Sequence, residues 1–291
     1  MKQENSIDAP KLSYGRIFLT CARNSLIRDM TFRGNFVLDC ISSVSWLLMN
    51  LGFYLLVFHH VESIGVNTGW RRDEFFVFLA TTWIINSIIE AFLMPNAQEF
   101  SELIRTGGLD FTLLKPADTQ FLISFRKVDW SSLSNLALGL VILGYSTIKL
   151  SGRTTPAWSL DWSVVALYLL YVVCGILLLY SLMILLAATS IWLGRNQSLY
   201  DFWFYITNFS RYPMEIYQGG WGLPLWVTFT FFIPVLVVVN VPARFLAQPL
   251  VPRTSWDWWL AGYAIFATVL SLLLSRYIFN RALKSYASAS S

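Results

Sequence analysis

The sequence has few charged residues and few residues of the kinds that carry catalysis. Aspartate, glutamate, lysine and arginine make up only 13% of its 291 residues, against about 25% in soluble domains. Its only two histidines, His59 and His60, are adjacent, so on a helix they point in different directions and are unsuited to share a metal ion. There is no HExxH sequence and no pair of neighbouring cysteine and histidine. These absences argue against an enzyme and against a metal site.

Cysteine is also scarce. The three cysteines, Cys21, Cys40 and Cys174, form no CxxC pair, and we interpret them as small packing residues. The first apolar run begins only near Asn35, with no short run and small-residue cleavage site before it. We therefore expect neither a disulfide framework nor a cleavable signal peptide.

Hydrophobic residues, in contrast, make up 56% of the chain. Stretches without charged residues cover 40–61, 75–89, 130–148, 162–194, 216–243 and 258–275. A membrane-spanning helix needs about 20 mostly apolar residues, and the second stretch reaches that length only if it includes Glu90. We predict an all-α membrane protein with a single transmembrane domain over 1–291, in which six spans occupy 35–279 between the flanking segments 1–34 and 280–291. A soluble protein would have to bury every one of these stretches completely.

The distribution of positive charge predicts the orientation of the spans. Six spans place both termini on one side, and lysine and arginine are enriched in cytoplasmic loops. If that side is the cytoplasm, 15 of the 21 lysines and arginines lie in cytoplasmic segments. The outer loops then hold only Arg71, Arg72, Lys149, Arg153, Arg244 and Arg253. We expect a multi-pass protein of the cell (inner or plasma) membrane, with both termini in the cytoplasm and no external domain.

The segment before the first span has the pattern of a helix that lies in the membrane surface. Apolar side chains recur every four residues at Tyr14, Phe18, Ala22 and Leu26, and arginines occupy the other side. Such a helix buries its apolar side at the bilayer surface and places its bases near anionic head groups. Because Ile27 interrupts the pattern, an ordinary basic stretch beside the membrane is the alternative.

A turn-prone polar stretch, IRTGGLDFTLLKP at 104–116, lies between the second and third predicted spans. Directly before it, Asn96 can cap a helix, and Glu99 stands three residues later, where a capping-box partner would reach back. Arg105 falls in the last turn, and Gly107 or Gly108 can take the left-handed conformation that ends a helix. We therefore expect a short cytoplasmic helix that is capped at both ends.

This predicted helix also has an apolar side, which consists of Phe100, Leu103 and Ile104. Two interpretations are open. Either the apolar side packs on the membrane helices or dips into the lipid head groups, or it docks into a cytoplasmic partner and carries force.

Three motifs connect the chain to a known family. They are GGLDFTLLKP at 107–116, FSRYPMEIY at 209–217 and FFIPVLVVVNVPA at 231–243. Together with six spans and short outer loops, they make nearly the whole chain resemble the membrane subunit of an ABC transporter of the ABC-2 type. The resemblance implies that the helix between spans two and three is a coupling helix, which seats in a groove of an ATPase subunit. The implied ATPase-coupling residues are Glu99, Phe100, Glu102, Leu103, Arg105, Gly107, Gly108, Leu109 and Asp110.

The chain has no GxxxxGK[ST] sequence that would bind nucleotide phosphates. The resemblance therefore implies a separate ABC ATPase subunit that uses ATP and Mg²⁺, and a transport subunit that binds no cofactor itself. A second permease subunit, identical or related, would be needed to enclose a path. The net charge of +4 does not predict a nucleic-acid partner, because the topology explains its distribution.

Polar residues and proline within the spans are candidates for lining that path. Glu90 is the one acid well inside a span, and Asn86 lies one turn earlier on the same face; such residues usually face protein or a water-filled cavity. A structural hydrogen bond, or a position near the interface, is the alternative for Glu90. Pro234 should kink or break the fifth span, and Arg211 is either a gate at its cytoplasmic mouth or an interfacial anchor. The apolar segment 240–252 fits the short re-entrant helices that the resemblance implies between spans five and six.

The first functional hypothesis is therefore the permease subunit of an ATP-driven exporter, whose cargo is amphipathic, drug-like or lipid-like. An ion-gradient-driven secondary transporter would instead place acids and broken helices at corresponding positions of two halves, and the sequence has no visible internal repeat. A membrane scaffold, for which the cytoplasmic helix is only a docking site, is the third hypothesis.

Overall fold

The computed structural model describes residues 13–64, 70–152, 161–193, 197–248 and 255–286, and within them it contains helices and no β-strand. The N-terminal and central helices are α1 (Tyr14–Thr31), α2 (Arg33–His60), α3 (Arg72–Phe92), α4 (Met94–Arg105), α5 (Gly108–Leu113), α6 (Thr119–Ser124) and α7 (Leu133–Ser151). They are followed by α8 (Trp162–Leu193), α9 (Gln197–Asn208), η1 (Phe209–Arg211), η2 (Met214–Tyr217), η3 (Gly220–Gly222), α10 (Leu223–Val227), the π-helix η4 (Thr228–Phe232), α11 (Val235–Ala247) and α12 (Ser255–Lys284).

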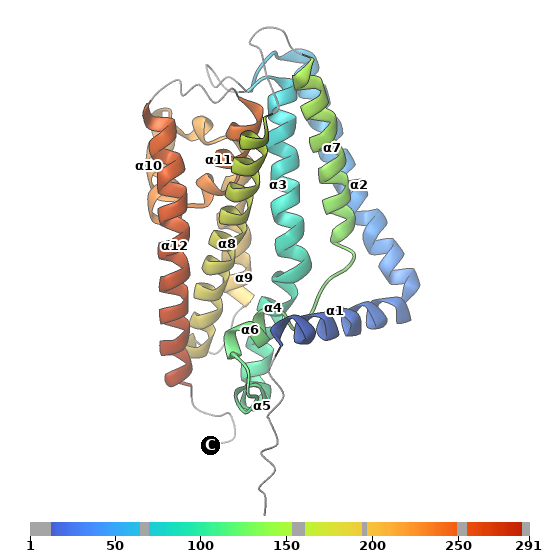
Figure 1. The fold of residues 1–291 in the computed structure, drawn as a ribbon, viewed down its shortest axis with the longest axis vertical. Coiled ribbons are helices and arrows are strands. Elements are labelled where there is room, and N and C mark those ends of the chain that lie inside the picture. Colours follow the sequence, from blue (N-terminus) through green and yellow to red (C-terminus); the bar gives the residue numbers. More distant parts are fainter. Residues whose placement is uncertain (1–12, 65–69, 153–160, 194–196, 249–254, 287–291) are drawn as a thin grey trace, which may run out of the picture.

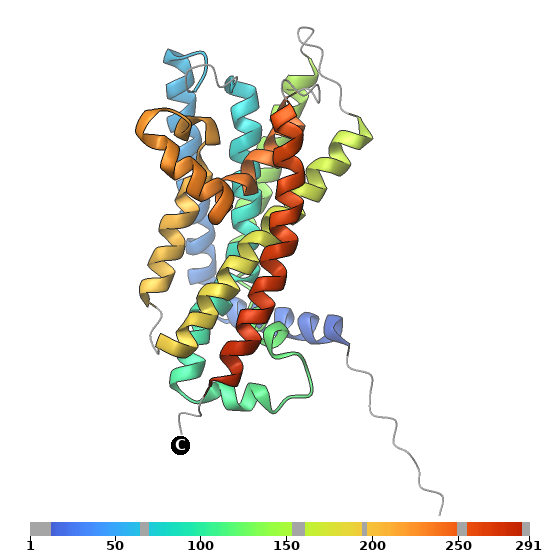
Figure 2. The same ribbon diagram turned by 90° about the vertical axis from the view of Figure 1, so that its left-hand side faces the viewer.

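The long helices α2, α3, α7, α8 and α12 run along the long axis of the molecule (Figure 1). The helix α1 lies across one end of this bundle, and α4, α5, α6 and the end of α12 lie at the same end (Figures 1 and 2). We call this end the base. The prediction of an all-α membrane protein is confirmed at this level: among the described residues five helices are long and apolar enough to span a membrane, or up to six if a bent pair counts as one.

The helix α3 forms the centre of the bundle. It contacts α7, α8 and α11, and fourteen of its side chains are buried, including Phe75, Phe78 and Ile85. The helices approach one another closely at glycine: a Cβ built on Gly139 of α7 would lie 3.1 Å from Ile84. The core of the protein is therefore built around the second predicted span.

The predicted fifth span, residues 216–243, is not one straight helix. The segments Gly220–Phe232 and Val235–Ala247 meet at an angle of 84°, and the break falls at Ile233 and Pro234, where proline has no N–H to continue the helix. The sequence predicted a kink or break of this span at Pro234, and the break is present. Residues 240–247 of the predicted re-entrant segment continue α11 and are mostly buried, whereas 249–252 lie outside the described residues.

Polar contacts fix α11 to η2. Asn240 accepts a hydrogen bond from the backbone N–H of Met214 (2.9 Å) and donates one to the carbonyl of Leu236 (2.7 Å). Arg244 forms an ion pair with Glu215, whose carboxylate also accepts a hydrogen bond from the indole of Trp70 (3.1 Å). These contacts hold the bent pair against the loop that leads into α3.

The predicted flanking segments are described in part. Of residues 1–34, those from 13 onward form α1 and the first residues of α2, and at the other end α12 continues to Lys284, past the predicted limit at 279. The predicted apolar stripe of α1 packs on protein: Tyr14 contacts Phe121 with ring centroids 4.9 Å apart, and Phe18 contacts Phe125 at 5.9 Å. The opposite side of α1 is exposed and includes Leu19.

Candidate functional site

The segment at the base between α3 and α7 is a folded unit of three short helices. We call residues 94–127, which contain α4, α5 and α6, the base unit. The helix α4 follows α3 after a single residue, Leu93, and has Pro95 in its first turn, where proline is tolerated because that N–H has no helical partner. The base unit is therefore joined to α3 by a single residue.

The predicted capping box of α4 is wrong. The Asn96 side chain caps no N–H; its amide donates to the carbonyls of Phe92 and Lys127, both at 2.8 Å, and accepts from the Lys127 N–H at 2.8 Å. Glu99 forms ion pairs with Lys127 (2.8 Å) and Arg126 (3.9 Å) instead of reaching back. Both residues thus join α4 to the chain that follows α6.

The predicted turn at the end of α4 is present. Gly107 has φ +73°, the left-handed conformation that glycine adopts without a steric penalty. Gly108 instead begins α5, and a Cβ there would lie 3.0 Å from the side chain of Leu103. These two glycines fold α5 back beside α4, and Asp110 lies in the first turn of α5.

Two of the predicted ATPase contacts are buried within the chain itself. Phe100 is 1% exposed and packs against Phe279 of α12, with ring centroids 6.1 Å apart, and Leu109 is fully buried in the same apolar cluster as Ile123. Because these side chains do not reach the surface, they hold the base unit on α8 and α12. The expectation that Phe100 contacts the ATPase from the surface is corrected on this observation, whereas Leu109 was expected only to support the turn behind the contacts.

The exposed part of the base unit, unlike its buried apolar part, carries both an ion pair and apolar side chains. Glu102 and Arg105 form an exposed ion pair at 2.5 Å, and Leu103 is half-buried. Apolar side chains on α5 and at its end are strongly exposed: Phe111 (73%), Leu113 (40%) and Leu114 (81%). We call these three residues the α5 patch. None of the three was among the predicted coupling residues, although the spacing of Phe111 and Leu114 is that of one helix face.

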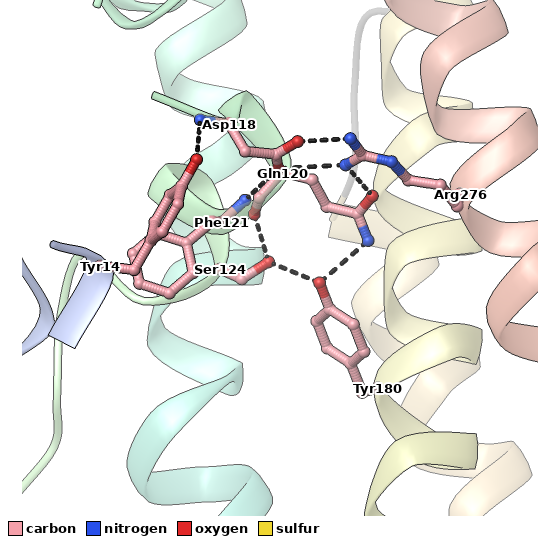
Figure 3. Close-up of polar contacts among 7 residues, drawn as sticks. All are labelled: Tyr14, Asp118, Gln120, Phe121, Ser124, Tyr180 and Arg276. Carbon is pink, nitrogen blue, oxygen red and sulfur yellow. Dashed lines mark hydrogen bonds and ion pairs between the residues drawn. The ribbon is translucent and has the colours of Figure 1, made fainter. Parts of the chain in front are cut away.

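A network of hydrogen bonds joins the base unit to three other helices (Figure 3). Asp118 caps α6 by accepting from the Phe121 N–H (3.0 Å), and its carboxylate forms an ion pair with Arg276 of α12. Arg276 also donates to the side chain of Gln120 (2.9 Å), which in turn donates to the hydroxyl of Tyr180 on α8 (2.9 Å).

The same network includes a contact with α1, and it favours the ionised form of Asp118. The Tyr14 hydroxyl accepts a hydrogen bond from the Asp118 N–H (3.3 Å), and Tyr14 lies beside α6 in Figure 3. The hydrogen bonds from Arg276 hold the pKa of the Asp118 carboxyl below its ordinary value, because they stabilise the ionised form. The base unit is therefore joined to α1, α8 and α12 by charged and neutral hydrogen bonds.

Three of the four predicted path residues line one cavity, of about 320 Å³. Asn86 and Glu90 enter it from α3, and Arg211 enters it from η1. Pro234 does not belong to this lining; it is buried at the bend before α11. Arg211 follows α9 and is partly buried, and it lines this cavity together with the two α3 residues.

The rest of the cavity lining was not predicted as a group. It includes Asp129 and Ser132 from the turn before α7, and Trp203 and Phe204 from α9. Asp129 and Ser132 also line a neighbouring cavity of about 490 Å³ near the joint of α1 and α2. Polar space therefore extends from the last two turns of α3 toward the base.

Comparison with known proteins supplies the family. Residues 44–290 match the family described as ABC-2 family transporter protein. The searches of curated proteins and of solved structures find no match. Because the family match covers most of the 291 residues and includes the base unit and the cavity, the chain belongs to the ABC-2 family of transporter proteins and is a multi-pass membrane transport component.

Proposed function

We propose that this protein is the permease subunit of an ATP-driven exporter that moves an amphipathic, drug-like or lipid-like molecule. The ABC ATPase, with its ATP and Mg²⁺, is a separate polypeptide, since no P-loop sequence occurs in this chain. A second permease subunit, either another copy or a related chain, completes the path. Family membership supports this proposal.

The base is the cytoplasmic end in this proposal, and both termini are in the cytoplasm of a cell expressing the protein in its inner or plasma membrane. Lysine and arginine are concentrated at cytoplasmic ends of membrane proteins. The described part of the base carries Arg16, Arg23, Arg28, Arg105, Lys115, Arg126, Lys127, Arg281 and Lys284. The described part of the opposite end carries Arg71, Arg72, Lys149 and Arg244.

The fifth crossing is made in two parts in this topology. The helix α9 rises from the base, and the bent pair of α10–η4 and α11 re-enters from the outer side before α12 returns. Backbone that is not helical at membrane depth needs polar partners within the protein. The Asn240 and Arg244 contacts supply such partners, which supports the re-entrant arrangement.

The α5 patch is the observation that carries the ATPase-coupling role. It presents exposed apolar side chains on a unit whose other side is anchored by Phe100 and Leu109. An exposed apolar group on such a unit is typical of a contact with another protein. We infer that Phe111 and Leu114 insert into the ATPase, and that Glu102, Arg105 and Asp110 contact it at the rim.

The ties of the base unit indicate how force would pass into the membrane. ATP binding closes the two ATPase subunits and moves the α5 patch. The movement reaches α3 through the short α3–α4 joint, and it reaches α8 and α12 through Tyr180 and Arg276. Those helices would then rock between inward and outward access.

The test is to purify the chain with its ATPase from its native host and to measure ATP hydrolysis in nanodiscs. Leu114→Asp should lower the recovery of ATPase and the activity about tenfold, because it puts a charge into an apolar contact. Leu19→Asp is the matched control, since it adds an acid at another exposed leucine of the base (66%). Its activity should stay near that of the unmodified protein.

Two results would overturn this proposal. One is full activity in the Leu114→Asp variant. The other is a flux that follows an ion gradient when no ATPase accompanies the chain, which would favour the secondary transporter.

A further inference from the structure

In the cavity between α3 and α9, the acid Glu90 and the base Arg211 do not form an ion pair with each other. Within the described residues, Glu90 has no hydrogen bond and no ion pair, and its oxygens lie more than 4.0 Å from the nitrogens of Arg211. The described contact of the Arg211 guanidinium is with the ring of Phe204, 5.5 Å from the ring centroid. Two opposite charges thus face the same space, separated from each other.

Charged side chains at membrane depth are costly unless a partner compensates them. The second acid of the cavity, Asp129, already has such partners: it accepts hydrogen bonds from the N–H and hydroxyl of Ser131 (2.9 and 2.6 Å) and from the hydroxyl of Ser132 (2.9 Å). Among the described residues, the side chains of Glu90 and Arg211 have no hydrogen bond or ion pair, and their opposite charges attract each other only across the cavity. A ligand that carries a positive and a negative group would compensate both.

The other walls of the cavity suit the same kind of ligand. Trp203 and Phe204 present aromatic rings beside the two charges, and aromatic faces attract ammonium groups. Ile89 and Met94 add an apolar surface. The volume of about 320 Å³ is at the lower end for ligand pockets, which run from about 300 Å³, so it fits a head group and not a complete lipid.

We propose that this cavity binds the head group of a zwitterionic amphiphile. The ammonium group lies between Glu90 and the ring of Trp203, and the phosphate or sulfonate lies against Arg211, which itself contacts the ring of Phe204. Asn86 is a neutral hydrogen-bond partner. This inference rests on the proposed function, because it names the chemical class of the transported molecule. The inference adds that the transported molecule carries one positive and one negative group, which the proposed export function alone does not require.

The test compares three probes that share one alkyl chain: tetradecylphosphocholine, tetradecyltrimethylammonium and tetradecyl sulfate. The purified full-length chain is placed in nanodiscs of phosphatidylglycerol, whose head group has no ammonium. Displacement of radiolabelled tetradecylphosphocholine is then measured, and binding to empty nanodiscs is subtracted. We expect tetradecylphosphocholine to bind most tightly.

Two variants separate the two charges. Glu90→Gln should weaken the binding of tetradecylphosphocholine and tetradecyltrimethylammonium about tenfold and leave tetradecyl sulfate unchanged. Arg211→Gln should weaken tetradecylphosphocholine and tetradecyl sulfate and leave tetradecyltrimethylammonium unchanged. Glu62→Gln, which removes an exposed acid outside the cavity, should change none of them.

The inference is overturned if the three probes compete equally, or if Glu90→Gln and Arg211→Gln weaken all probes to the same extent. It is also overturned if Glu62→Gln has the effect expected of Glu90→Gln. The assay uses neither ATP nor the ATPase, so its failure leaves the coupling role of Leu114 standing. Conversely, selective binding together with full activity of Leu114→Asp would retain the site and reject the ATP-driven mechanism.

Discussion

The helices α2 and α3 are both long and apolar enough to span a membrane, yet they occupy opposite environments. In α2 only Leu47 is buried, whereas fourteen side chains of α3 are buried. The exposed side chains of α2 include Trp46, Met49 and Phe53, each 58% exposed. In Figure 1, α2 also diverges from α7 toward the base.

The difference shows what apolar composition means for a membrane protein. Lipid tails are as apolar as leucine, so the hydrophobic effect does not decide which spans lie inside a bundle; close packing does. The inner helices have glycines at their contacts, such as Gly139 against α3 and Gly175 of α8 against α11. In α2, a Cβ on Gly52 would meet nothing within 4 Å. The contrast can be tested by changing matched residues on buried and exposed faces.

The largest effect is expected for Gly175→Leu. A Cβ at this position would lie 2.8 Å from the carbonyl oxygen of Val238, and overpacking of a close helix contact costs about 3 kcal/mol or more. We expect little folded protein, measured as the monodisperse fraction in size-exclusion chromatography. Gly52→Leu makes the same change on α2 and should fold normally. Equal yields of the two variants would contradict the close approach of α8 and α11.

A smaller effect is expected when a buried phenylalanine is truncated. Phe78 of α3 is fully buried, so Phe78→Ala should reduce the free energy of unfolding by about 3 kcal/mol through lost packing. Phe53→Ala on α2 removes the same group from an exposed position and should change it by less than about 0.5 kcal/mol. The measurement is the Tm in nanodiscs. If Phe53→Ala were as harmful as Phe78→Ala, α2 would not be a peripheral helix.

Local features of the sequence predicted local features of the structure. The turn at Gly107 and the bend at Pro234 follow from the backbone chemistry of single residues, and the structure has both. The long apolar runs likewise predicted most of the spanning helices. Within 216–243, Pro234 predicted a kink or break, but nothing in the sequence specified the 84° angle between the two helical segments.

The predictions that were wrong concerned residues whose contacts lie far away in the sequence. Asn96 and Glu99 have the spacing of a capping box, but hydrogen bonds and ion pairs with the chain at Lys127 replace it. Phe100 looked like a docking residue because Phe279, which covers it, lies in the last helix. The pairing of Glu90 and Asn86 on one face was predictable, whereas their meeting with Arg211 required the path of α9.

The smallest effect is expected at the base, where polar contacts replace the close packing that separates α3 from α2. Asp118→Asn keeps a capping side chain on α6 but removes the ion pair with Arg276. Since both side chains are about a third or more exposed, the loss in the free energy of unfolding at neutral pH should be at most about 1 kcal/mol.

This contribution should depend on pH. The folded-state pKa of Asp118 is lowered, so the contribution is present above the ordinary value of 3.8 and is lost as the pH falls through the lowered pKa. The difference in Tm between the variant and the unmodified protein should therefore disappear in strong acid. Asp161→Asn serves as the control, because Asp161 accepts hydrogen bonds from the Trp162 N–H and the Ser163 hydroxyl at the start of α8 and has no arginine partner among the described residues. A difference for Asp118→Asn that stays constant from neutral to acid pH would mean that its carboxylate charge does not hold α6 to α12.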